Sequence, residues 1–161
     1  MIEIKTEGFQ VISVDIFDTL LFRLVGEPHQ IFEEVGKKAL TSNLLHYSIT
    51  SEEFVLLRIK AEQAARKDLL ERNGHSEVTL GQIYEFLPNS IGDRNQIASL
   101  EIQVECEYCY SNVEIVKLLE DAYFRKLPVI LTSDMYLNKV QLEQILRWNE
   151  FDFNLIKEIY V

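Results

Sequence analysis

The sequence feature that most constrains the fold is a short apolar segment that breaks off in acidic and hydroxyl side chains. It reads Val11-Ile12-Ser13-Val14-Asp15-Ile16-Phe17-Asp18-Thr19-Leu20-Leu21. A short apolar run bounded by turn signals predicts a buried β-strand. Ligands bind outside the carboxyl ends of the strands in open α/β sheets, so we expect Asp15 at the mouth of a site, with Asp18 and Thr19 just beyond it. An acid that closes a buried strand is costly unless a metal, a ligand or hydrogen-bond donors receive it.

The size and charge of the chain argue against several classes of protein. Its 161 residues, 47% of them hydrophobic, suffice for one ordinary domain or for a small core domain with an inserted module. With 16 basic against 26 acidic residues, the formal charge of -10 repels nucleic acid and anionic membranes, so local groups or a metal ion must hold any anionic substrate. We find neither a signal-peptide start nor an apolar window of transmembrane length, and we expect a cytoplasmic protein with no nucleic-acid or membrane partner.

A second predicted strand lies far along the chain from the first. The first covers residues 9–15, and the second covers residues 128–133, Pro128-Val129-Ile130-Leu131-Thr132-Ser133. A structureless loop as long as the segment between them is improbable in a compact domain. The pattern of that segment is helical, so we predict an inserted helical cap.

Start and stop signals predict four helices in this insertion. The first follows Pro28, and the second begins with the capping box Thr50-Ser51-Glu52-Glu53 and ends near Asn73-Gly74. A short third helix opens at Thr79-Leu80-Gly81-Gln82 and closes at Leu87-Pro88, and a fourth runs from Asp93 towards Tyr110.

Helices and strands alternate after the insertion. A helix capped by Asn112 leads into the second strand, a helix over residues 138–149 follows it, and residues 156–161 resemble a third strand. This alternation favours a parallel sheet. We predict an α/β core from residues 1–22 and 111–161, with residues 23–110 as the cap.

The cysteines and histidines give no metal-site pattern. Cys106 and Cys109 form one Cys-x-x-Cys pair inside the fourth predicted helix, without the second pair that a zinc site needs. The simpler interpretation is two reduced, partly buried thiols, and redox or metal chemistry is the alternative. The histidines His29, His46 and His75 are expected on the surface.

Two motifs at the ends of the predicted strands resemble those of the haloacid dehalogenase superfamily. They are Asp15-Ile16-Phe17-Asp18-Thr19-Leu20 and Thr132-Ser133-Asp134-Met135-Tyr136-Leu137. The chain looks most like predicted hydrolases of that superfamily that are often linked to glycosyltransferase and surface-polysaccharide systems. The resemblance implies a Rossmann-like core with a helical cap inserted after the first strand, and an aspartyl-enzyme mechanism that uses Mg²⁺.

The resemblance also implies roles for individual residues. Asp15 would be the nucleophile and a metal ligand, and Phe17 would offer its backbone carbonyl to the metal. Ser133 would orient the transferred phosphoryl group, and Thr19 would support the first loop. Ser133 has a simpler alternative, in which its hydroxyl only satisfies the end of the strand.

Two further residues have a functional and a structural interpretation each. Asp134 would act near the metal and substrate, or it would cap the following helix. Arg23 would face the crevice and anchor substrate, or it would form a surface salt bridge.

Phe17 departs from the pattern of most phosphatases in the superfamily. They carry an aspartate two positions after the nucleophile as general acid and base, and a phenylalanine side chain can do neither. Asp18 could turn its carboxylate into the crevice and serve instead, or it could cap the turn that follows. A halide leaving group needs no proton, so Phe17 also agrees with a dehalogenase.

The later motifs of the superfamily, a lysine and an acidic pair, are not visible before Val161. Lys139 and Lys157 are the nearby lysines, and each is more simply a solvated residue. In the sheet order that the resemblance implies, the first strand is central, so here it would be an unpaired edge that invites another chain. We therefore expect a homodimer, or pairing with a further chain segment, at that edge.

Three functions remain open at this point. The first is a phosphatase of a small phosphorylated metabolite, such as a sugar phosphate, that forms an aspartyl phosphate on Asp15 with Mg²⁺. The second is a catalytically inert interaction or regulatory module, or the N-terminal fragment of a longer enzyme. The third is hydrolysis of carbon–halogen bonds.

Overall fold

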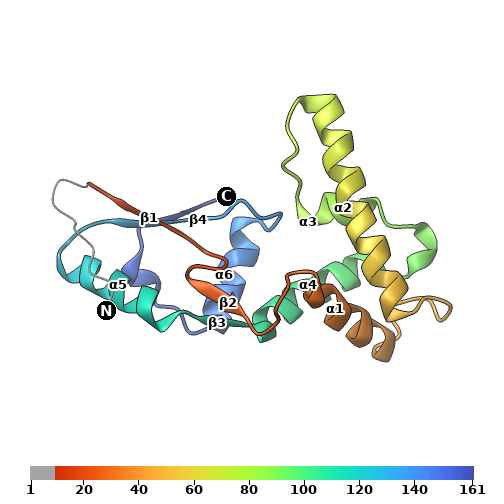
Figure 1. Cartoon of the computed structure of the whole chain (residues 1–161), viewed down its shortest axis with the longest axis horizontal. Coiled ribbons are helices and arrows are strands. Elements are labelled where there is room, and N and C mark those ends of the chain that lie inside the picture. Colours follow the sequence, from red (N-terminus) through yellow and green to blue (C-terminus); the bar gives the residue numbers. More distant parts are fainter. Residues whose placement is uncertain (1–9) are drawn as a thin grey trace.

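The computed structural model describes residues 10–161, which form an α/β fold in two parts (Figure 1). One part is built on a parallel sheet in the order β1–β4–β5, formed by β1 (Ile12–Asp15), β4 (Val129–Thr132) and β5 (Glu158–Tyr160). The predicted parallel α/β core is confirmed. The three predicted strands were each a little too long, and residue 9 of the first lies outside the described residues.

Two helices accompany this sheet, α5 (Val113–Phe124) and α6 (Lys139–Trp148), followed by a short 3-10 turn, η2 (Phe153–Leu155). The side chain of Asn112 caps α5 by accepting a hydrogen bond from the Glu114 N–H. Asn138 caps α6 in a reciprocal capping box with Gln141. The alternative that Asp134 caps this helix is therefore wrong, because Asn138 occupies the N-cap position.

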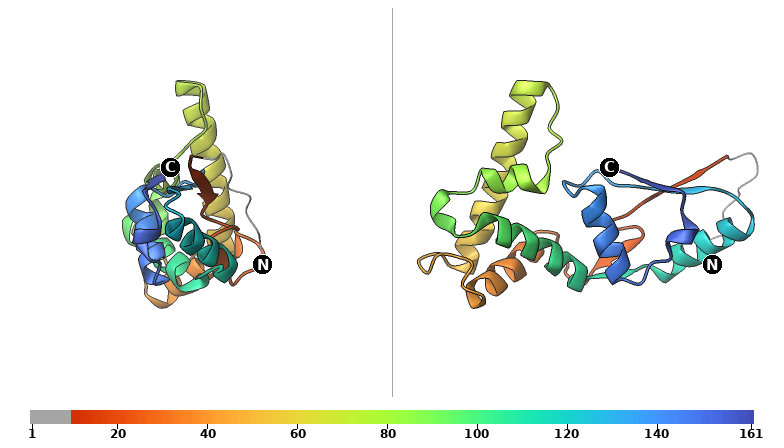
Figure 2. Two further views of the ribbon diagram at one scale, coloured as in Figure 1. Left: turned by 90° about the vertical axis from the view of Figure 1, so that its left-hand side faces the viewer. Right: turned by 180° about the vertical axis from the view of Figure 1, so that it is seen from behind.

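The other part is helical and contains α1 (Gln30–Thr41), α2 (Ser51–Asn73), α3 (Leu80–Glu85), η1 (Asn89–Ile91) and α4 (Arg94–Tyr108). The capping box of Thr50 and Glu53 starts α2, and Gly74 ends it in the left-handed conformation at φ 77°. Both ends agree with the sequence prediction. Seen from behind, the far end of α2 projects away from the body of the molecule (Figure 2).

A short antiparallel ribbon, β2 (Leu21–Arg23) with β3 (Cys109–Ser111), joins the two parts, and the sequence did not reveal it. The ribbon continues past the paired residues, where the Leu24 N–H donates to the Tyr108 carbonyl at 2.8 Å. The helix predicted to run towards Tyr110 therefore ends earlier. Cys109 lies in a strand, so the prediction that both cysteines lie in the same helix is wrong. The pairing of distant segments overrides the local helical pattern.

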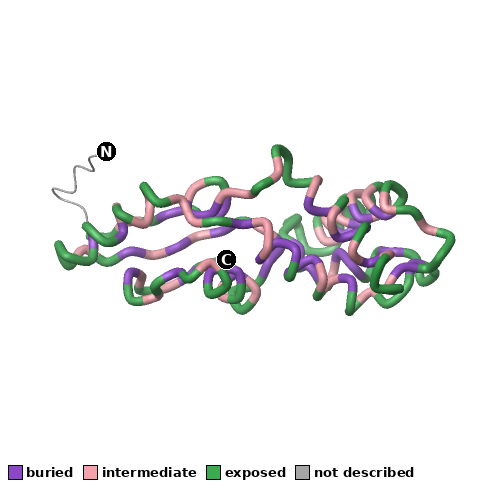
Figure 3. Tube along the Cα trace, turned by 90° about the horizontal axis from the view of Figure 1, so that it is seen from below, coloured by how far each residue is buried: buried purple, intermediate pink, exposed green. Residues whose placement is uncertain are grey.

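Buried segments run through both parts of the molecule (Figure 3), and the buried apolar residues form one cluster. Ile16, Leu20 and Leu21 have no exposed surface, which fixes the chain directly after β1. Both cysteines are buried free thiols. Within residues 10–161, no helix has the length and apolar character needed to cross a membrane.

Candidate active site

A cavity of about 640 Å³ lies at the carboxyl ends of β1 and β4, between the sheet and the helical part. It brings together every residue that the sequence singled out as a site residue: Asp15, Phe17, Asp18, Thr19, Arg23, Ser133 and Asp134. These residues come from two chain segments that are far apart in the sequence. The parallel pairing of Asp15 with Thr132 sets the register that aligns them.

Asp15 is the last residue of β1, and its side chain is exposed to the cavity rather than buried. Its carboxylate accepts a hydrogen bond from the Thr19 hydroxyl, with 3.5 Å between Oδ2 and Oγ1. Partial burial raises the pKa of Asp15 above its ordinary value, and the negative charges of Asp134 and Asp18 raise it further, against hydrogen bonds from the Ile16 N–H and Thr19. Three carboxylates thus crowd the same end of the cavity.

The loop after β1 is a tight turn held by its own backbone. The Asp18 N–H donates to the Leu21 carbonyl at 2.8 Å, and the Leu21 N–H donates to the Ile16 carbonyl at 2.7 Å. Asn112 adds a hydrogen bond from its side-chain amide to the Thr19 carbonyl at 3.0 Å. The sequence predicted Asn112 only as a helix cap, so its second role emerges from the tertiary structure.

Asp18 has the left-handed backbone conformation, with φ at 57°. Such a φ is uncommon for a residue other than glycine, and aspartate is one of the types that tolerate it. Across the described hydrogen bonds, none involves the Asp18 carboxylate, so the alternative that this side chain caps the turn has no support. Its carboxylate is exposed and lines the cavity beside Asp15.

Ser133 follows β4 and is 8% exposed. Its Oγ accepts a hydrogen bond from the Met135 N–H at 3.3 Å, and its own N–H donates to the Tyr160 carbonyl at 3.0 Å. Because Oγ acts as an acceptor in this turn, the hydroxyl proton is available for a ligand in the cavity. The structural and the functional interpretations of Ser133 are therefore compatible.

Phe17 and Arg23 form a stacked pair on the cavity wall. The Phe17 ring is 6% exposed, and the Arg23 guanidinium lies 4.3 Å from the ring centroid. Arg23 also donates two hydrogen bonds to Glu105, from Nε at 3.0 Å and from Nη2 at 3.1 Å, and one from Nη2 to the Met135 sulfur. The Arg23 side chain is only 5% exposed, so the alternative of a surface salt bridge is wrong. The pair with Glu105 is buried, although Arg23 still lines the cavity.

The helical part contributes cavity residues that sequence reasoning missed as site residues: Pro28, His29, Phe32, Glu62, Arg66 and Glu105. Helical periodicity predicts which residues share a face, but it does not tell which face meets the cavity. His29, expected on the surface, is exposed and lies at the cavity.

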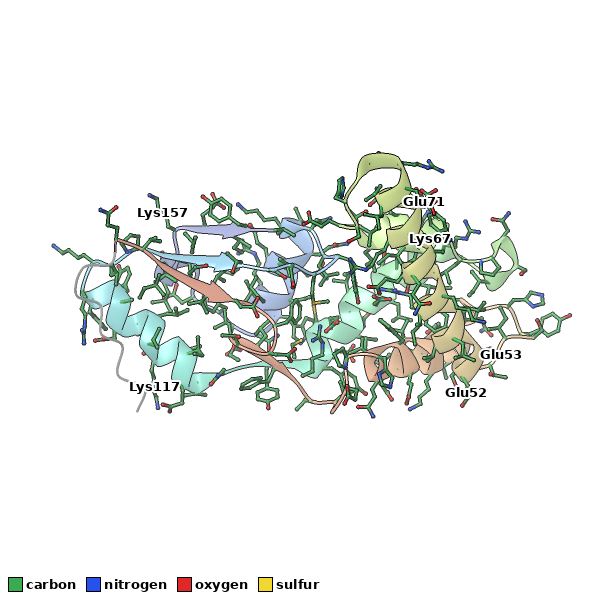
Figure 4. All side chains as sticks on the ribbon, turned by 45° about the horizontal axis from the view of Figure 1, so that its top comes forward. Glu52, Glu53, Lys67, Glu71, Lys117 and Lys157 are labelled. Atoms are coloured by element: carbon green, nitrogen blue, oxygen red, sulfur yellow. The ribbon has the colours of Figure 1, made fainter. Side chains whose placement is uncertain are left out.

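Neither Lys139 nor Lys157, the two lysines considered in place of the missing lysine motif, lies at the cavity. Lys139 is bonded to Glu158. Lys157 lies towards the end of the sheet away from the helical part (Figure 4). Of the residues described, those that line the cavity include no lysine.

The acidic end of the cavity fits a hard cation such as Mg²⁺. Mg²⁺ in proteins usually keeps several waters and binds through one or two carboxylates plus the phosphate of a substrate. Asp15 and Asp134 are close enough for the charge of one to raise the pKa of the other. The Phe17 carbonyl accepts no hydrogen bond from the described residues, which leaves it available as a ligand. Residues 10–161 hold no group of three or more acidic, cysteine or histidine side chains that would enclose a metal by themselves.

The fold is a Rossmann-like α/β fold, with the cavity at the carboxyl ends of its parallel strands. An L-2-haloacid dehalogenase matches at a TM-score of 0.53, with 14% identity over 93% of this chain and 62% of that chain. An L-2-haloacid dehalogenase from Xanthobacter autotrophicus matches at 0.55, with 11% identity over 94% of this chain and 56% of that one. A candidate beta-phosphoglucomutase from Thermotoga maritima matches at 0.54, with 13% identity over 94% of this chain and 61% of that one.

At these identities the likeness shows the fold alone, which this chain shares with the two haloacid dehalogenases and the candidate beta-phosphoglucomutase. The chain spans 56–62% of the length of these solved structures. No protein-family model matches the sequence. No curated protein matches it either.

Proposed function

We propose that the protein is a phosphatase that acts on a small phosphate ester, such as a sugar phosphate in carbohydrate metabolism, through an aspartyl phosphate on Asp15. The observation that carries the proposal is the convergence of Asp15, Thr19, Asp18 and Ser133 on one cavity at the carboxyl ends of two parallel strands. The cavity volume of about 640 Å³ suits a substrate of the size of a sugar phosphate.

In the first step, a carboxylate oxygen of Asp15 attacks phosphorus, and the bond from phosphorus to the ester oxygen breaks. Thr19 holds the attacking carboxylate through its 3.5 Å hydrogen bond, and the free proton of the Ser133 hydroxyl bonds a phosphoryl oxygen. The leaving alkoxide takes a proton, which the Asp18 carboxyl group supplies. General acid catalysis of this kind contributes roughly 10²- to 10⁴-fold.

In the second step, water attacks the aspartyl phosphate and its proton passes to Asp18. The bond from phosphorus to the Asp15 oxygen breaks, inorganic phosphate leaves, and both carboxyl groups return to their starting states. Mg²⁺ bound by Asp15, Asp134 and the Phe17 carbonyl would supply positive charge that offsets the charge of the phosphoryl group. The left-handed turn at Asp18, with its unbonded carboxylate, supports this assignment of the proton carrier.

The test compares an aryl phosphate, whose leaving group needs little protonation, with an alkyl phosphate, whose leaving group needs a proton. Asp15→Asn should abolish hydrolysis of both and remove the phosphorylated aspartate seen by mass spectrometry after acid quenching. Asp18→Asn should slow the alkyl ester at least tenfold more than the aryl ester. Asp121→Asn, at an exposed position paired with Arg125, is the matched control and should change neither rate.

Two other functions make different predictions in the same experiments. Hydrolysis of a carbon–halogen bond is favoured by Phe17, because a halide leaves without a proton, and it predicts chloride release from 2-chloropropionate without Mg²⁺. An inert interaction module predicts no hydrolysis of either ester and no change with Asp15→Asn. Hydrolysis that survives Asp15→Asn would contradict the phosphatase proposal.

A further inference from the structure

The cavity has two walls of different chemical character. The wall formed by the sheet carries the carboxylates of Asp15, Asp18 and Asp134. The wall formed by the helical part carries Arg66 and Glu62 from α2 and Glu105 from α4, of which Glu105 is already bonded to Arg23. A ligand that fills the cavity therefore meets an acidic end at the nucleophile and a guanidinium on the opposite part of the molecule.

Arg66 is held in place by three hydrogen bonds. Its Nε and Nη2 donate to Glu62 Oε1 at 3.0 and 2.8 Å, and its Nη1 donates to the Ser76 carbonyl at 3.0 Å. A guanidinium has five N–H donors, so donors remain for a ligand. The side chain is 36% exposed, which makes these donors accessible from the cavity.

Glu62 is held in turn by Arg58, which also forms a buried ion pair with Glu101. Arg58 donates from Nη1 to Glu62 Oε2 at 3.1 Å, and its Nε and Nη2 donate to Glu101 at 2.9 and 2.8 Å. Arg58 and Glu101 have no exposed surface. The network contains two arginines, Arg58 and Arg66, and two glutamates, Glu62 and Glu101. Its net charge is therefore zero, and the glutamates add no excess negative charge beside Arg66. A guanidinium fixed in this way loses little entropy when it binds an anion.

The other arginine at the cavity, Arg23, is less suited to a ligand. Its side chain is 5% exposed, against 36% for Arg66, although a glutamate occupies the Nε–Nη2 edge of both guanidiniums. Within the part of the chain that the structure describes, Arg66 is therefore the more accessible guanidinium at the cavity.

Resting on the proposed phosphatase function, we propose that the substrate is a small phosphate ester whose other end carries a second anionic group, a carboxylate or a phosphate, bound by Arg66. The cavity of about 640 Å³ is much larger than one phosphoryl group, so the remainder of the substrate reaches the helical wall. Arginine forms strong charge-assisted hydrogen bonds with carboxylate and phosphate, and Arg66 can form them with the Nη1 and Nη2 protons that Ser76 and Glu62 leave unused. The proposed mechanism requires the phosphoryl group at Asp15, so the second anion lies on the side of the helical part, where Arg66 lines the cavity.

The test uses pairs of esters that differ in the second anionic group. Glycerol 3-phosphate is compared with 3-phosphoglycerate, and fructose 6-phosphate with fructose 1,6-bisphosphate, which separates a carboxylate from a phosphate as the second anion. The wild-type kcat/KM should favour the doubly anionic member of at least one pair about tenfold or more, the effect of one charged hydrogen bond. Arg66→Gln should remove this preference, and Arg66→Lys, which keeps the charge but loses the fork, should retain part of it.

Arg72→Gln is the matched control, because Arg72 lies on the same helix, is 72% exposed and does not line the cavity. This variant should keep the wild-type preference. A wild-type enzyme without preference, or an Arg66→Gln variant that loses equal activity on both members of each pair, would overturn the inference.

Equilibrium binding of the same compounds to the Asp15→Asn variant separates this inference from the proposed function. Binding that still favours the doubly anionic member and depends on Arg66 supports the anion subsite even if no ester is hydrolysed. Hydrolysis without any role for Arg66 supports the phosphatase and removes the subsite. Loss of both results contradicts both proposals.

Discussion

The guanidinium of Arg23 stacks on the ring of Phe17, 4.3 Å from its centroid, two residues after the proposed nucleophile. The ring is buried beneath the arginine, and Glu105 neutralises the arginine through two hydrogen bonds. A stacked aromatic and a paired cation cannot transfer a proton at this position. In the proposed phosphatase mechanism, proton transfer at the Asp15 end of the cavity therefore falls to a neighbouring carboxylate, and we propose Asp18, which is exposed and lines the cavity beside Asp15.

Of the ion-pair residues in the helical part, Arg58 should be the one whose replacement lowers the free energy of unfolding most. It has no exposed surface and lies within 4.5 to 5.6 Å of the ring centroids of Phe32, Tyr84 and Tyr136. Arg58→Met leaves Glu101 buried without its partner, which should lower the free energy of unfolding by about 3–5 kcal/mol. Urea denaturation measures the change. The double variant Arg58→Met with Glu101→Leu should recover part of the loss, and a double variant as unstable as the single one would contradict this account.

Asp15 should reduce the stability of the fold at neutral pH. Burial and the charges of Asp134 and Asp18 raise its folded pKa above the ordinary 3.8, so the folded state disfavours the ionised form. The contribution of protonated Asp15 to the free energy of unfolding is complete below pH 3.8. It is lost as the pH rises through the pKa that Asp15 has in the folded state. Asp15→Asn should raise the melting temperature at pH 7, and this gain should shrink towards pH 3.8. If Asp15→Asn instead melts below the wild type at pH 7, repulsion between Asp15 and the neighbouring carboxylates does not destabilise the fold.

The titration of Asp15 in the Mg²⁺-free protein should respond to the neighbouring carboxylates. Asp134→Asn removes a repulsive charge and should lower the pKa of Asp15. Asp18→Asn should lower it less, because Asp18 raises the pKa of Asp15 less than Asp134 does. NMR titration of the Asp15 carboxyl carbon without Mg²⁺ measures both shifts, and a higher pKa in either variant would contradict the prediction.

Cys106 should be inert in the folded protein. Burial, together with the charges of Glu105 and Glu107, raises the pKa of its thiol from 9.0 to about 11. The thiolate is therefore scarce at pH 8, and iodoacetamide should modify Cys106 only after unfolding in guanidinium chloride. The stability that this thiol contributes is complete below pH 9 and is lost as the pH rises towards about 11. Mass spectrometry detects the modification. If Cys106 is modified in the folded protein at pH 8, its thiol is not buried as described.

The open edge of β1 should be an interaction surface. Within the described residues, β1 pairs with β4 on one side and with no strand on the other, and Val11, directly before β1, is 45% exposed. An unpaired strand edge leaves backbone N–H and C=O groups that pair readily with another strand. We expect the chain to self-associate through this edge, and Val11→Lys should weaken the association as measured by sedimentation equilibrium. The matched control is Val140→Lys on α6, 74% exposed and remote in sequence from the edge. If both variants weaken the association equally, the chain does not associate through the open edge of β1.

Local signals in the sequence were sufficient for most elements. Thr50 with Glu53 and Asn138 with Gln141 form the capping boxes that define the starts of α2 and α6. These signals work because the capping groups lie three residues apart and form the same hydrogen bonds in any tertiary context. The ribbon of β2 and β3 was missed, because each strand has three residues and gains its hydrogen bonds only from the distant partner.

The sequence by itself determined the parallel α/β core, most of the helices, and the candidate residues at the ends of β1 and β4, because apolar period and capping are local properties. Only the tertiary structure decided what surrounds those residues. In the folded protein, Arg23 pairs with Glu105, and the Asp18 carboxylate accepts no hydrogen bond from the described residues. Arg66 lies on the opposite wall of the cavity. These outcomes depend on which helix faces meet the sheet, and packing between distant segments fixes that choice.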